Sequence, residues 1–449
     1  MEQKLSVIGL GKLGCTMMVC FAHKGWEVIG VDVNELTIET ILRGRSPIDE
    51  PFVEEMISDN AERIRVTSDC ENAVLNSDVS FVIVPTPSKE DGSFSTEYVE
   101  NATMEVAKAL TKKNSYHLIV ITSTVLPGDS LRISYEIARE SGKELGKDFG
   151  VVYNPDFIAL GKIVSDFLNP DMILIGEYDE KSGDIIQDIH LKLIDSNPTF
   201  HRMNFFNAEL AKISLNAYCT LKITFANIIA EICENLPGGD SNKVLSAVGA
   251  DSRVGQKYLK GGLGYSGPCF PRDNRALAHS ARFFGTTNYF CEMTDAINNY
   301  HKTERICNLL LGYMEEKNTK ELAILGLSYK EDTPVIEESV SISVIKTLWE
   351  KGMNIKVFDP VAMENAKREL EGYDNIYYAS SEYDCIDGTS VCFIATPWKQ
   401  FFSLNHQEVI KRMKKSSIIL DSWGVLPYDR ATNRGKKVEV KQLGKNYQS

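Results

Sequence analysis

Residues 4–14 read KLSVIGLGKLG, and this stretch decides how the N-terminal part of the chain folds. An apolar run that ends in a glycine-rich turn predicts a buried strand leading directly into a helix. Gly9 permits the tight turn, Gly11 lets the backbone approach a phosphate closely, and Gly14 lets the helix pack against the strand. The amide groups and dipole at the start of such a helix favour a pyrophosphate. The stretch therefore predicts a dinucleotide-binding site, against the alternative of a purely structural turn.

An acidic residue at the end of the next predicted strand specifies the kind of dinucleotide. Asp32 ends the segment WEVIGVD, 23 residues after Gly9, where a carboxylate can bind ribose hydroxyls. Val33 and Asn34 follow, so this position offers no arginine to a 2′-phosphate. The sequence therefore predicts NAD as the cofactor in preference to NADP.

The same alternation of strands and helices recurs along two parts of the chain. Apolar segments that predict strands lie at 4–11, 26–33, 78–87, 116–125 and 172–176, and again at 321–329, 354–360, 389–397 and 416–422. Helical segments separate several of them. This alternation predicts an α/β fold with a doubly wound parallel sheet in each part.

Between the two α/β parts the sequence predicts a helical region. Residues 204–236 form one long, mostly apolar helical run, which Pro237 and two glycines stop. We therefore expect two Rossmann-like domains joined by a long central helix and a helical domain. This helix has more apolar surface than its flanking domains can cover, which predicts a homodimer built on it. The expected divisions are 1–200, 201–310 and 315–435, followed by a polar tail over 436–449.

Composition and charge exclude several classes of function. The net charge of −13 argues against non-specific binding to nucleic acid. The ten cysteines are scattered with no CxxC pair, which indicates free thiols in a reducing compartment and neither a disulfide framework nor a zinc site. No run of about 18 apolar residues predicts a membrane span, and the first residues enter a strand without a signal-peptide pattern. We expect a cytoplasmic protein with no metal and no membrane partner.

A polar stripe runs along the long central helix. Glu209, Lys212, Asn216 and Thr220 recur at three- and four-residue spacing, so they share one side of the helix. A solvated surface stripe is the ordinary interpretation. Because the rest of this helix is apolar nearly all round, the stripe is expected to face a cleft or a partner instead. A partly buried Lys212 would release its proton more readily and could act in proton transfer.

The loop GGLGYSGPCFPRD, residues 261–273, places a cysteine where a buried structural cysteine would not be expected. Its glycines allow close approach of the backbone to a ligand. Four cations surround the cysteine in the sequence against the single acid Asp273, namely Arg253, Lys257, Lys260 and Arg272. Such surroundings favour an anionic ligand and the thiolate form of Cys269, which attacks carbonyl carbon. The loop therefore predicts either a nucleophile or, in the alternative, a structural thiol.

Taken together, the segments GLGKLG, TSTVLPG, NPDF, AELAKISLNAY, GGLGYSGPCFPRD and GLSYKEDT occur in the order found in one known family. From Lys4 to Ser422 the sequence resembles the UDP-glucose and GDP-mannose dehydrogenases. The resemblance implies oxidation of the primary alcohol of a nucleotide-linked sugar to a carboxylate with two NAD+. It also implies an NAD-binding domain, a helical dimerising domain and a C-terminal domain that binds the nucleotide sugar.

The resemblance also implies roles for single residues. Cys269 corresponds to the nucleophile that carries the acid as a thioester, and Lys212 and Asn216 to residues that hold the sugar oxygen. Asp273 and Thr124 correspond to residues that order water and assist proton transfer, and Asp156 to the base for hydrolysis. Arg253 corresponds to an arginine that reaches the substrate of the partner subunit. Ligand contacts are implied for the cofactor at Gly9, Gly11, Gly14, Asp32, Thr86, Thr124 and Lys330, and for the substrate at Lys212, Asn216, Arg253, Tyr258, Lys260 and Gly264.

Four positions depart from the family pattern. Asp156 stands where the family usually has glutamate and Leu160 where many relatives have a carboxylate, and Glu337 and Trp423 stand where relatives commonly have arginine. The changes fall mainly on sugar and nucleotide recognition and leave the substrate open. UDP-glucose, oxidised to UDP-glucuronate for a surface polysaccharide, is the expected substrate. The alternatives are a UDP-N-acetylhexosamine or GDP-mannose. An NAD-dependent epimerase, a two-electron hydroxyacid dehydrogenase and a binding protein without catalysis are more remote, since they have no use for the cysteine loop.

Overall fold

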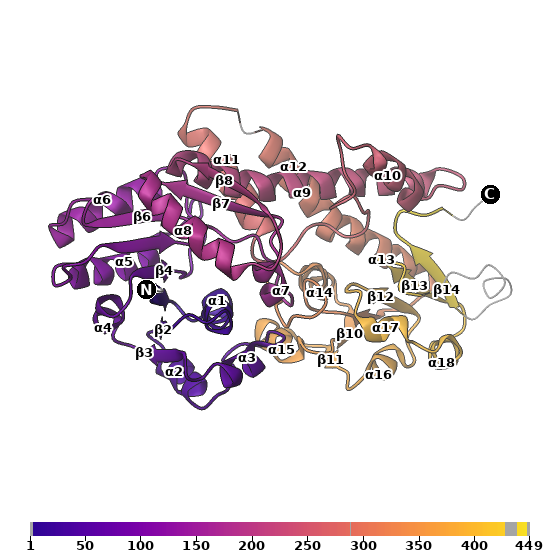
Figure 1. The fold of residues 1–449 in the computed structure, drawn as a ribbon. Coiled ribbons are helices and arrows are strands. Elements are labelled where there is room, and N and C mark those ends of the chain that lie inside the picture. Colours follow the sequence, from indigo (N-terminus) through magenta and orange to yellow (C-terminus); the bar gives the residue numbers. More distant parts are fainter. Residues whose placement is uncertain (1–2, 288, 427–437, 447–449) are drawn as a thin grey trace. The chain divides into compact units, whose positions relative to one another are not determined.

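The computed structural model describes residues 3–287, 289–426 and 438–446, and Figure 1 shows the fold as a ribbon. The chain forms two compact units, one of Met1–Ser214 with His279–Gly285 and the other of Leu215–Ala278 with Thr286–Ser449. The boundary between them falls inside two helices, α9 (Phe205–Asn235) and α11 (Phe270–Phe283). The division into three domains made from the sequence stays a prediction.

The first unit is built on an eight-stranded sheet with the order β3-β2-β1-β4-β5-β6-β7-β8. Its strands are β1 (Leu5–Ile8), β2 (Val28–Val31), β3 (Ile64–Thr67), β4 (Val79–Val82), β5 (His117–Ile121), β6 (Phe149–Tyr153), β7 (Met172–Glu177) and β8 (Thr199–Met203). The chain winds outward in both directions from β1 and β4, so the doubly wound fold predicted from the sequence is confirmed.

One pair of strands in this sheet runs against the parallel prediction. Strands β6 and β7 are antiparallel, with Val152 opposite Glu177. An antiparallel neighbour needs no crossover, because the chain can leave one strand and enter the next at the same edge of the sheet. The connection 154–171 therefore begins and ends at the same edge of the sheet, and it carries the predicted site residue Asp156.

Helices cover both faces of the first sheet, as a parallel sheet requires. One face packs against α1 (Lys12–His23), α3 (Val53–Asp59), α7 (Ile163–Leu168) and α8 (Glu180–Leu193). The other face packs against α4 (Cys70–Leu75), α5 (Glu97–Leu110) and α6 (Asp129–Ser141). The strands β1, β4, β5 and β6 are buried at every position. This double burial explains why these strands have continuous apolar sequences.

The second unit contains a six-stranded parallel sheet with the order β11-β10-β9-β12-β13-β14. Its strands are β9 (Glu321–Leu325), β10 (Asn354–Phe358), β11 (Ile376–Tyr378), β12 (Val391–Ile394), β13 (Ser417–Asp421) and β14 (Val438–Gln442). Its helices are α10 (Ser241–Ala250), α12 (Tyr289–Asn299), α13 (Arg305–Glu316), α14 (Val340–Glu350), α15 (Met363–Glu369), α16 (Glu382–Ile386), α17 (Lys399–Phe402) and α18 (His406–Arg412), with a π-helix η1 (Tyr300–Glu304) between α12 and α13. The second Rossmann-like sheet was predicted from the sequence.

The polar tail predicted for 436–449 is wrong for its described part. Strand β14 pairs in parallel with β13, and Val438 and Val440 are buried. These valines alternate with charged and polar residues, so one face of the strand packs on the core while the other faces solvent. The alternation gives this edge strand a polar composition, which explains why composition alone suggested a tail.

The long central helix predicted over 204–236 is α9, which runs without a break from Phe205 to Asn235. It is also the one helix of the described residues whose length and apolarity would suit a membrane span, but 44% of its most apolar window is buried inside the protein. A core helix of a soluble protein has the same properties.

Candidate active site

The glycine-rich turn after β1 has the geometry that a dinucleotide needs. Gly9 has a φ of +96°, and a Cβ atom there would lie 2.5 Å from the carbonyl oxygen of Ile83. A Cβ on Gly14 would lie 1.8 Å from the carbonyl oxygen of Gly9, so both positions require glycine. Gly11 faces open space instead, and no side chain caps the start of α1 there. A helix start without a side-chain cap and the open approach at Gly11 fit a pyrophosphate.

Asp32 lies beside this turn, at the end of β2. Its carboxylate accepts hydrogen bonds from the backbone amides of Leu10 (2.7 Å) and Asn34 (2.8 Å). The side chain is half-buried and the next residue, Val33, is 96% exposed. A carboxylate fixed in this way beside the turn fits the ribose of NAD and repels a 2′-phosphate.

Replacing Asp32 by alanine is expected to lower the preference for NAD+ over NADP+ at least tenfold, about 1.4 kcal/mol. The physical reason is that the substitution removes the negative charge that opposes the 2′-phosphate. Initial rates with each cofactor at saturating substrate measure the effect. Val33→Ala, which keeps the carboxylate, is the matched control. Equal use of both cofactors by the unmodified protein would contradict the assignment.

Two predicted cofactor residues meet at the carboxyl edge of the first sheet. The Thr86 hydroxyl, after β4, donates to the carbonyl oxygen of Thr124, after β5, at 2.8 Å. The Ser123 hydroxyl bridges the amide and carbonyl of Val84 at 2.9 and 2.7 Å. Among the described residues, the Thr124 hydroxyl itself has no hydrogen-bond partner. It is therefore available to a ligand close to the point where the strand order reverses between β1 and β4.

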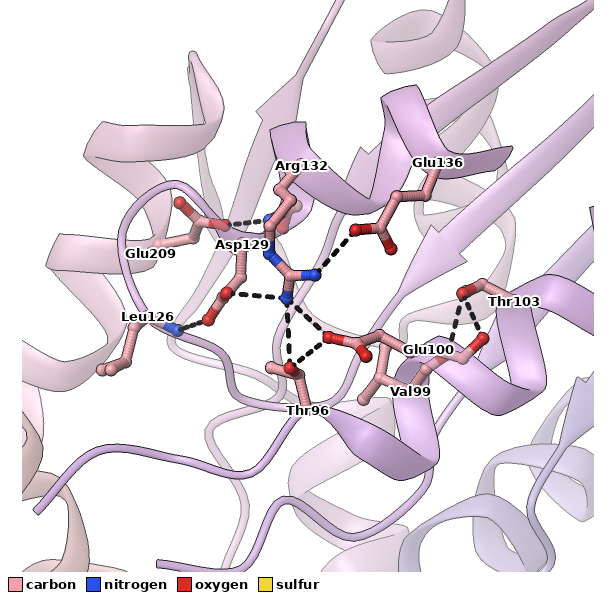
Figure 2. A network of polar contacts seen from close by, with 10 residues as sticks. Thr96, Val99, Glu100, Thr103, Leu126, Asp129, Arg132, Glu136 and Glu209 are labelled. Carbon is pink, nitrogen blue, oxygen red and sulfur yellow. Dashed lines mark hydrogen bonds and ion pairs between the residues drawn. The ribbon is translucent and has the colours of Figure 1, made fainter. Parts of the chain in front are cut away.

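Polar contacts hold the segment that follows Thr124, and Figure 2 shows Leu126, Asp129 and Glu209 among them. The Glu209 carboxylate on α9 accepts from the amides of Gly128 (2.7 Å) and Ser130 (2.8 Å) at the start of α6. Asp129 accepts from the Leu126 amide at 3.0 Å and is paired with Arg132. Glu209 is fully buried, and burial raises its pKa to about 7. Glu209, a member of the predicted polar stripe, therefore stabilises the start of α6, where a cleft or a partner was expected.

Lys212, the next stripe residue, lies against the segment NPDF. Its ammonium donates to the carbonyl oxygen of Asp156 and lies 4.3 Å from the centre of the Phe157 ring. Burial raises the pKa of the Asp156 carboxyl to about 7, although Lys212 opposes the shift. One Asp156 oxygen, Oδ2, is buried without a hydrogen-bond partner. A half-neutral carboxyl next to a buried ammonium suits a group that exchanges protons near neutral pH.

Residues that the sequence pattern did not predict hold this segment. His190 on α8 bonds to Asn154 Oδ1 at 2.7 Å, and Asn154 donates to the carbonyl oxygen of Leu174 at 2.9 Å. Farther on, Glu50 accepts from the amides of Gly161 and Ile163, both at 2.8 Å. Leu160 therefore lies in a segment fixed by a carboxylate from elsewhere in the chain. The partners are far apart in the sequence, so no local pattern could have indicated them.

Cys269 lies immediately before α11, in the second unit. It is the exposed cysteine of the chain, while the other nine are buried or half-buried. Burial raises the pKa of several of those nine thiols, for example that of Cys15 to about 12. A thiol at a helix N-terminus has the opposite tendency, because the helix dipole favours the thiolate. This exposure and this place fit a reactive thiol, and the catalytic role of Cys269 stays a prediction.

Asp273, one turn into α11, is the centre of a compact polar group. Its amide donates to the Cys269 carbonyl oxygen at 2.8 Å, which closes the first turn of the helix. Its fully buried carboxylate accepts from Asn216 Nδ2 at 2.6 Å and from Arg272 Nε at 2.9 Å. The structure thus brings the predicted residues Asn216 and Asp273 together next to the cysteine. Their catalytic roles stay predictions.

Two asparagines that the sequence analysis missed hold the cysteine loop. Asn227 on α9 accepts from the Gly262 amide at 2.9 Å and donates to the Leu263 carbonyl at 3.1 Å. Asn298 on α12 donates to the Tyr265 carbonyl at 3.0 Å. Gly264 packs so closely on α12 that a Cβ atom would lie 2.5 Å from Asn298 Oδ1. Asn227 continues the helical spacing of the polar stripe, so extending that stripe could have found it.

The predicted cations and aromatics of the loop lie in different settings. Arg253 is exposed and forms a bidentate pair with Asp251 at 2.9 and 2.7 Å. Tyr258 has a φ of 67°, and its ring centre lies 5.6 Å from that of Phe270 at the start of α11. The Lys260 ammonium lies 5.7 Å from the Trp423 ring. A strained, half-exposed tyrosine is a common feature of ligand sites, and Tyr258 and Lys260 thus both lie near the cysteine loop.

The second sheet repeats the turn geometry of the first. Gly326 follows β9 with a φ of +96°, and its amide donates to the carbonyl oxygen at the end of β10 at 2.8 Å. The next amide, that of Leu327, donates to Asp359 at 2.7 Å, as Leu10 does to Asp32. Lys330 lies in the segment that follows, and Trp423 donates to the Ala395 carbonyl at 2.8 Å after β12. The carboxyl edge of this sheet is therefore a second candidate site for a nucleotide.

Comparison with known proteins gives one consistent result. Models of the UDP-glucose/GDP-mannose dehydrogenase family match residues 3–194 (NAD binding domain), 206–300 (central domain) and 323–428 (UDP binding domain). The chain is 32% identical to UDP-glucose 6-dehydrogenase AglM of Haloferax volcanii, over 99% of both chains. It is 31% identical to UDP-glucose 6-dehydrogenase TuaD of Bacillus subtilis, over 93% of this chain and 88% of the relative.

A solved structure agrees with these sequence matches. The UDP-glucose dehydrogenase from Pyrobaculum islandicum superposes with a TM-score of 0.87 at 31% identity, over 99% of this chain and 98% of that one. The chain belongs to the UDP-glucose/GDP-mannose dehydrogenase family and is an NAD-dependent nucleotide-sugar dehydrogenase.

Proposed function

We propose that this enzyme oxidises UDP-glucose to UDP-glucuronate, with two NAD+ consumed for each sugar. The observation that carries the proposal is Cys269, the exposed thiol at the start of α11, next to the buried group of Asp273, Asn216 and Arg272. A single alcohol oxidation needs no such nucleophile. Relatives with nearly full coverage carry the name UDP-glucose 6-dehydrogenase, which supports the choice of sugar.

The first half of the reaction converts the primary alcohol to an aldehyde. When bound, NAD+ accepts a hydride in each of the two oxidations. The proposed roles of Lys212 and Asn216, four residues apart on one side of α9, are to stabilise negative charge on the sugar oxygen as its proton leaves. Thr86, Thr124 and Lys330 are the proposed cofactor contacts, with Asp32 and the glycine turn.

The second half depends on the cysteine. The Cys269 thiolate adds to the aldehyde carbon, and the resulting thiohemiacetal loses a second hydride and a proton to give a thioester. Water then attacks the thioester carbon, the C–S bond breaks, and the carboxylate leaves with the thiol restored. Asp156 is the proposed base for this water, and Asp273 and Thr124 assist the proton transfers. Arg253, Tyr258, Lys260 and Gly264 are the proposed substrate contacts.

The count of NADH formed per sugar consumed tests the proposal. Two equivalents are expected with UDP-glucose, whereas a two-electron dehydrogenase gives one and an epimerase or a silent binding protein gives none. The same assay with GDP-mannose and UDP-N-acetylhexosamines tests the choice of base and sugar. The departures at Leu160, Glu337 and Trp423 make this comparison necessary. A higher kcat/KM for any of these than for UDP-glucose would replace the proposed substrate.

The apolar side of α9 supports a homodimer. Five exposed side chains at spacings of three, four and seven residues lie along one side of the helix and its end, namely Tyr218, Phe225, Ile228, Ile232 and Leu236. Monomers rarely expose a continuous apolar stripe of this kind, which marks an interface between chains. The proposed partner is a second copy, whose Arg253 would complete the substrate site.

Replacing Ile232 by glutamate is expected to convert the dimer to a monomer, because a charge would be buried without a partner at the interface. Light scattering at assay concentration measures the mass, and activity should fall with it, since Arg253 then no longer reaches a neighbouring site. Leu191→Glu, on the exposed side of α8, is the matched control and should stay dimeric. An unmodified protein that is monomeric and fully active would rule out this assembly.

The proposed location is the cytoplasm, and the proposed use of the product is as a uronic-acid donor for a polysaccharide. The scattered free cysteines support a reducing compartment.

A further inference from the structure

Glu338 links the nucleophile's helix to a segment of the second sheet domain. Its carboxylate pairs with Arg275 Nη2 on α11 at 2.6 Å and with the Lys302 ammonium on η1. Lys302 is 6% exposed, and Glu338 is half-buried. Burial opposes ionisation, but Lys302 and Arg275 hold the pKa of Glu338 below its usual value. The Glu338 carboxylate is therefore charged, and it connects its own segment to both α11 and η1.

Two unusual backbone features converge on this contact. Glu338 has a φ of 54°, a left-handed conformation that a residue with a side chain adopts at a cost of about 1 kcal/mol or more. Lys302 lies in the middle of η1, a single π-helical turn inserted between two α-helices. Such turns are rare and occur frequently at functional sites. The ion pair of Lys302 and Glu338 thus joins one residue from each distortion.

The segment that Glu338 ends touches the cysteine loop at a second point. The Tyr329 ring packs on Gly267, two residues before Cys269, so closely that a Cβ atom there would lie 2.5 Å from the ring. Tyr265 of the same loop donates to Asp295 at 3.1 Å, and Asp295 lies 3.9 Å from Arg275 Nε. Segment 327–339 thus holds both the loop before the cysteine and the helix after it.

We propose that Glu338 is a positioning residue for Cys269, through which segment 327–339 sets the place of the nucleophile for the second oxidation. This inference rests on the proposed function. The first oxidation does not use the cysteine, so a displaced thiol slows only the steps from aldehyde to acid. Glu338 touches neither the thiol nor the reacting carbon; it acts through Arg275 and α11.

Glu338→Gln is expected to slow the second oxidation by on the order of 10²-fold, the effect of a misplacement of about 1 Å. The NADH formed per UDP-glucose consumed should fall from two toward one, with released aldehyde trapped by hydroxylamine, while KM for UDP-glucose changes little. Alkylation of Cys269 by iodoacetamide without substrate, read by peptide mass, should also slow several-fold, because the thiolate depends on its place at the helix N-terminus. A purely structural defect would lower both oxidations together.

Glu364→Gln is the matched control, because it breaks an exposed ion pair with Lys367 in the same unit. If Glu338→Gln gives the same stoichiometry and alkylation rate as this control, the positioning role is wrong. If Glu338→Gln does not fold, Arg275→Gln carries the same comparison, since it removes the contact through which Glu338 acts on α11 and leaves Glu338 paired with Lys302. If the unmodified enzyme forms one NADH per sugar, the proposed function fails, and the alkylation rate alone decides the role of Glu338.

Discussion

Cys269→Ser is expected to accumulate a covalent ester between the enzyme and the sugar acid. A serine oxygen can add to the aldehyde, and the adduct can lose its hydride, but the resulting ester resists attack by water more than a thioester does. Turnover to the acid should then fall by a factor of about 10³ or more, the size of effect seen when a nucleophile is disabled. Intact-mass spectrometry after incubation with UDP-glucose and NAD+ would show the adduct, and digestion would locate it on residue 269.

Cys269→Ala separates the two halves of the reaction. This variant should bind UDP-glucose and NAD+ and make or release the aldehyde slowly, without carrying it to the acid. Cys70→Ser, at a half-buried thiol outside the site, is the control and should retain full activity. Acid formation at the native rate by both the alanine and the serine variants would exclude the thioester route.

Asp156→Asn is expected to lower the rate of acid release by about 10² to 10⁴-fold, the usual contribution of a general base. A thioester on Cys269 should then accumulate in the mass spectrum, since the two oxidations before it do not need this base. In the unmodified enzyme, acid release should decrease as the pH falls through about 7, where burial places the pKa of Asp156. The asparagine variant should lack that pH dependence.

Stability provides an independent test of the same residue. The folded state raises the pKa of Asp156, so the native structure favours the protonated carboxyl and loses stability as the pH rises from the unfolded value toward 7. Asp156→Asn should therefore lose less stability than the unmodified protein between about pH 4 and 7, the range between the ordinary pKa of an aspartate and the pKa of Asp156 in the folded state. Asp166→Asn, which disturbs the same segment through its bond to the Ala159 amide, is the control. A variant that loses activity and stability together would indicate a structural role for Asp156.

The parts of the site predicted from the sequence are those that depend on local geometry. The turn at Gly9, Gly11 and Gly14 needs only a strand, three glycines and a helix, all of which are contiguous. The side of α9 that carries Lys212 and Asn216 follows from helical spacing alone. In the same way, the apolar strands buried on both faces, such as β5, were predicted because short apolar runs rich in β-branched residues favour buried strands.

The rest depends on contacts between distant residues, which no local pattern contains. Glu209 was predicted to face a cleft or a partner, but its carboxylate accepts hydrogen bonds from two backbone amides at the start of α6. The antiparallel direction of β7 depends on the path of the connection before it. The edge strand β8 is too exposed to have an apolar sequence, and β11 has only three residues. Glu338 itself has a left-handed backbone conformation, and its partner Lys302 lies in a π-helical turn. Local preferences disfavour both conformations.

The turn after the first strand has the same geometry in both sheets, but the aspartate beside it differs in how many hydrogen bonds it already accepts. Asp32 is half-buried and accepts two amides, so part of its carboxylate is free for a diol. Its counterpart Asp359 is 1% exposed and accepts from Leu327, Ser328, Val361, Ala362 and the Trp398 indole. A carboxylate has about four lone pairs, so Asp359 has none to offer a ribose. The same supersecondary unit thus presents a carboxylate with unused lone pairs in the first sheet and a fully occupied carboxylate in the second, so the proposed recognition of a ribose by this carboxylate is confined to the first sheet.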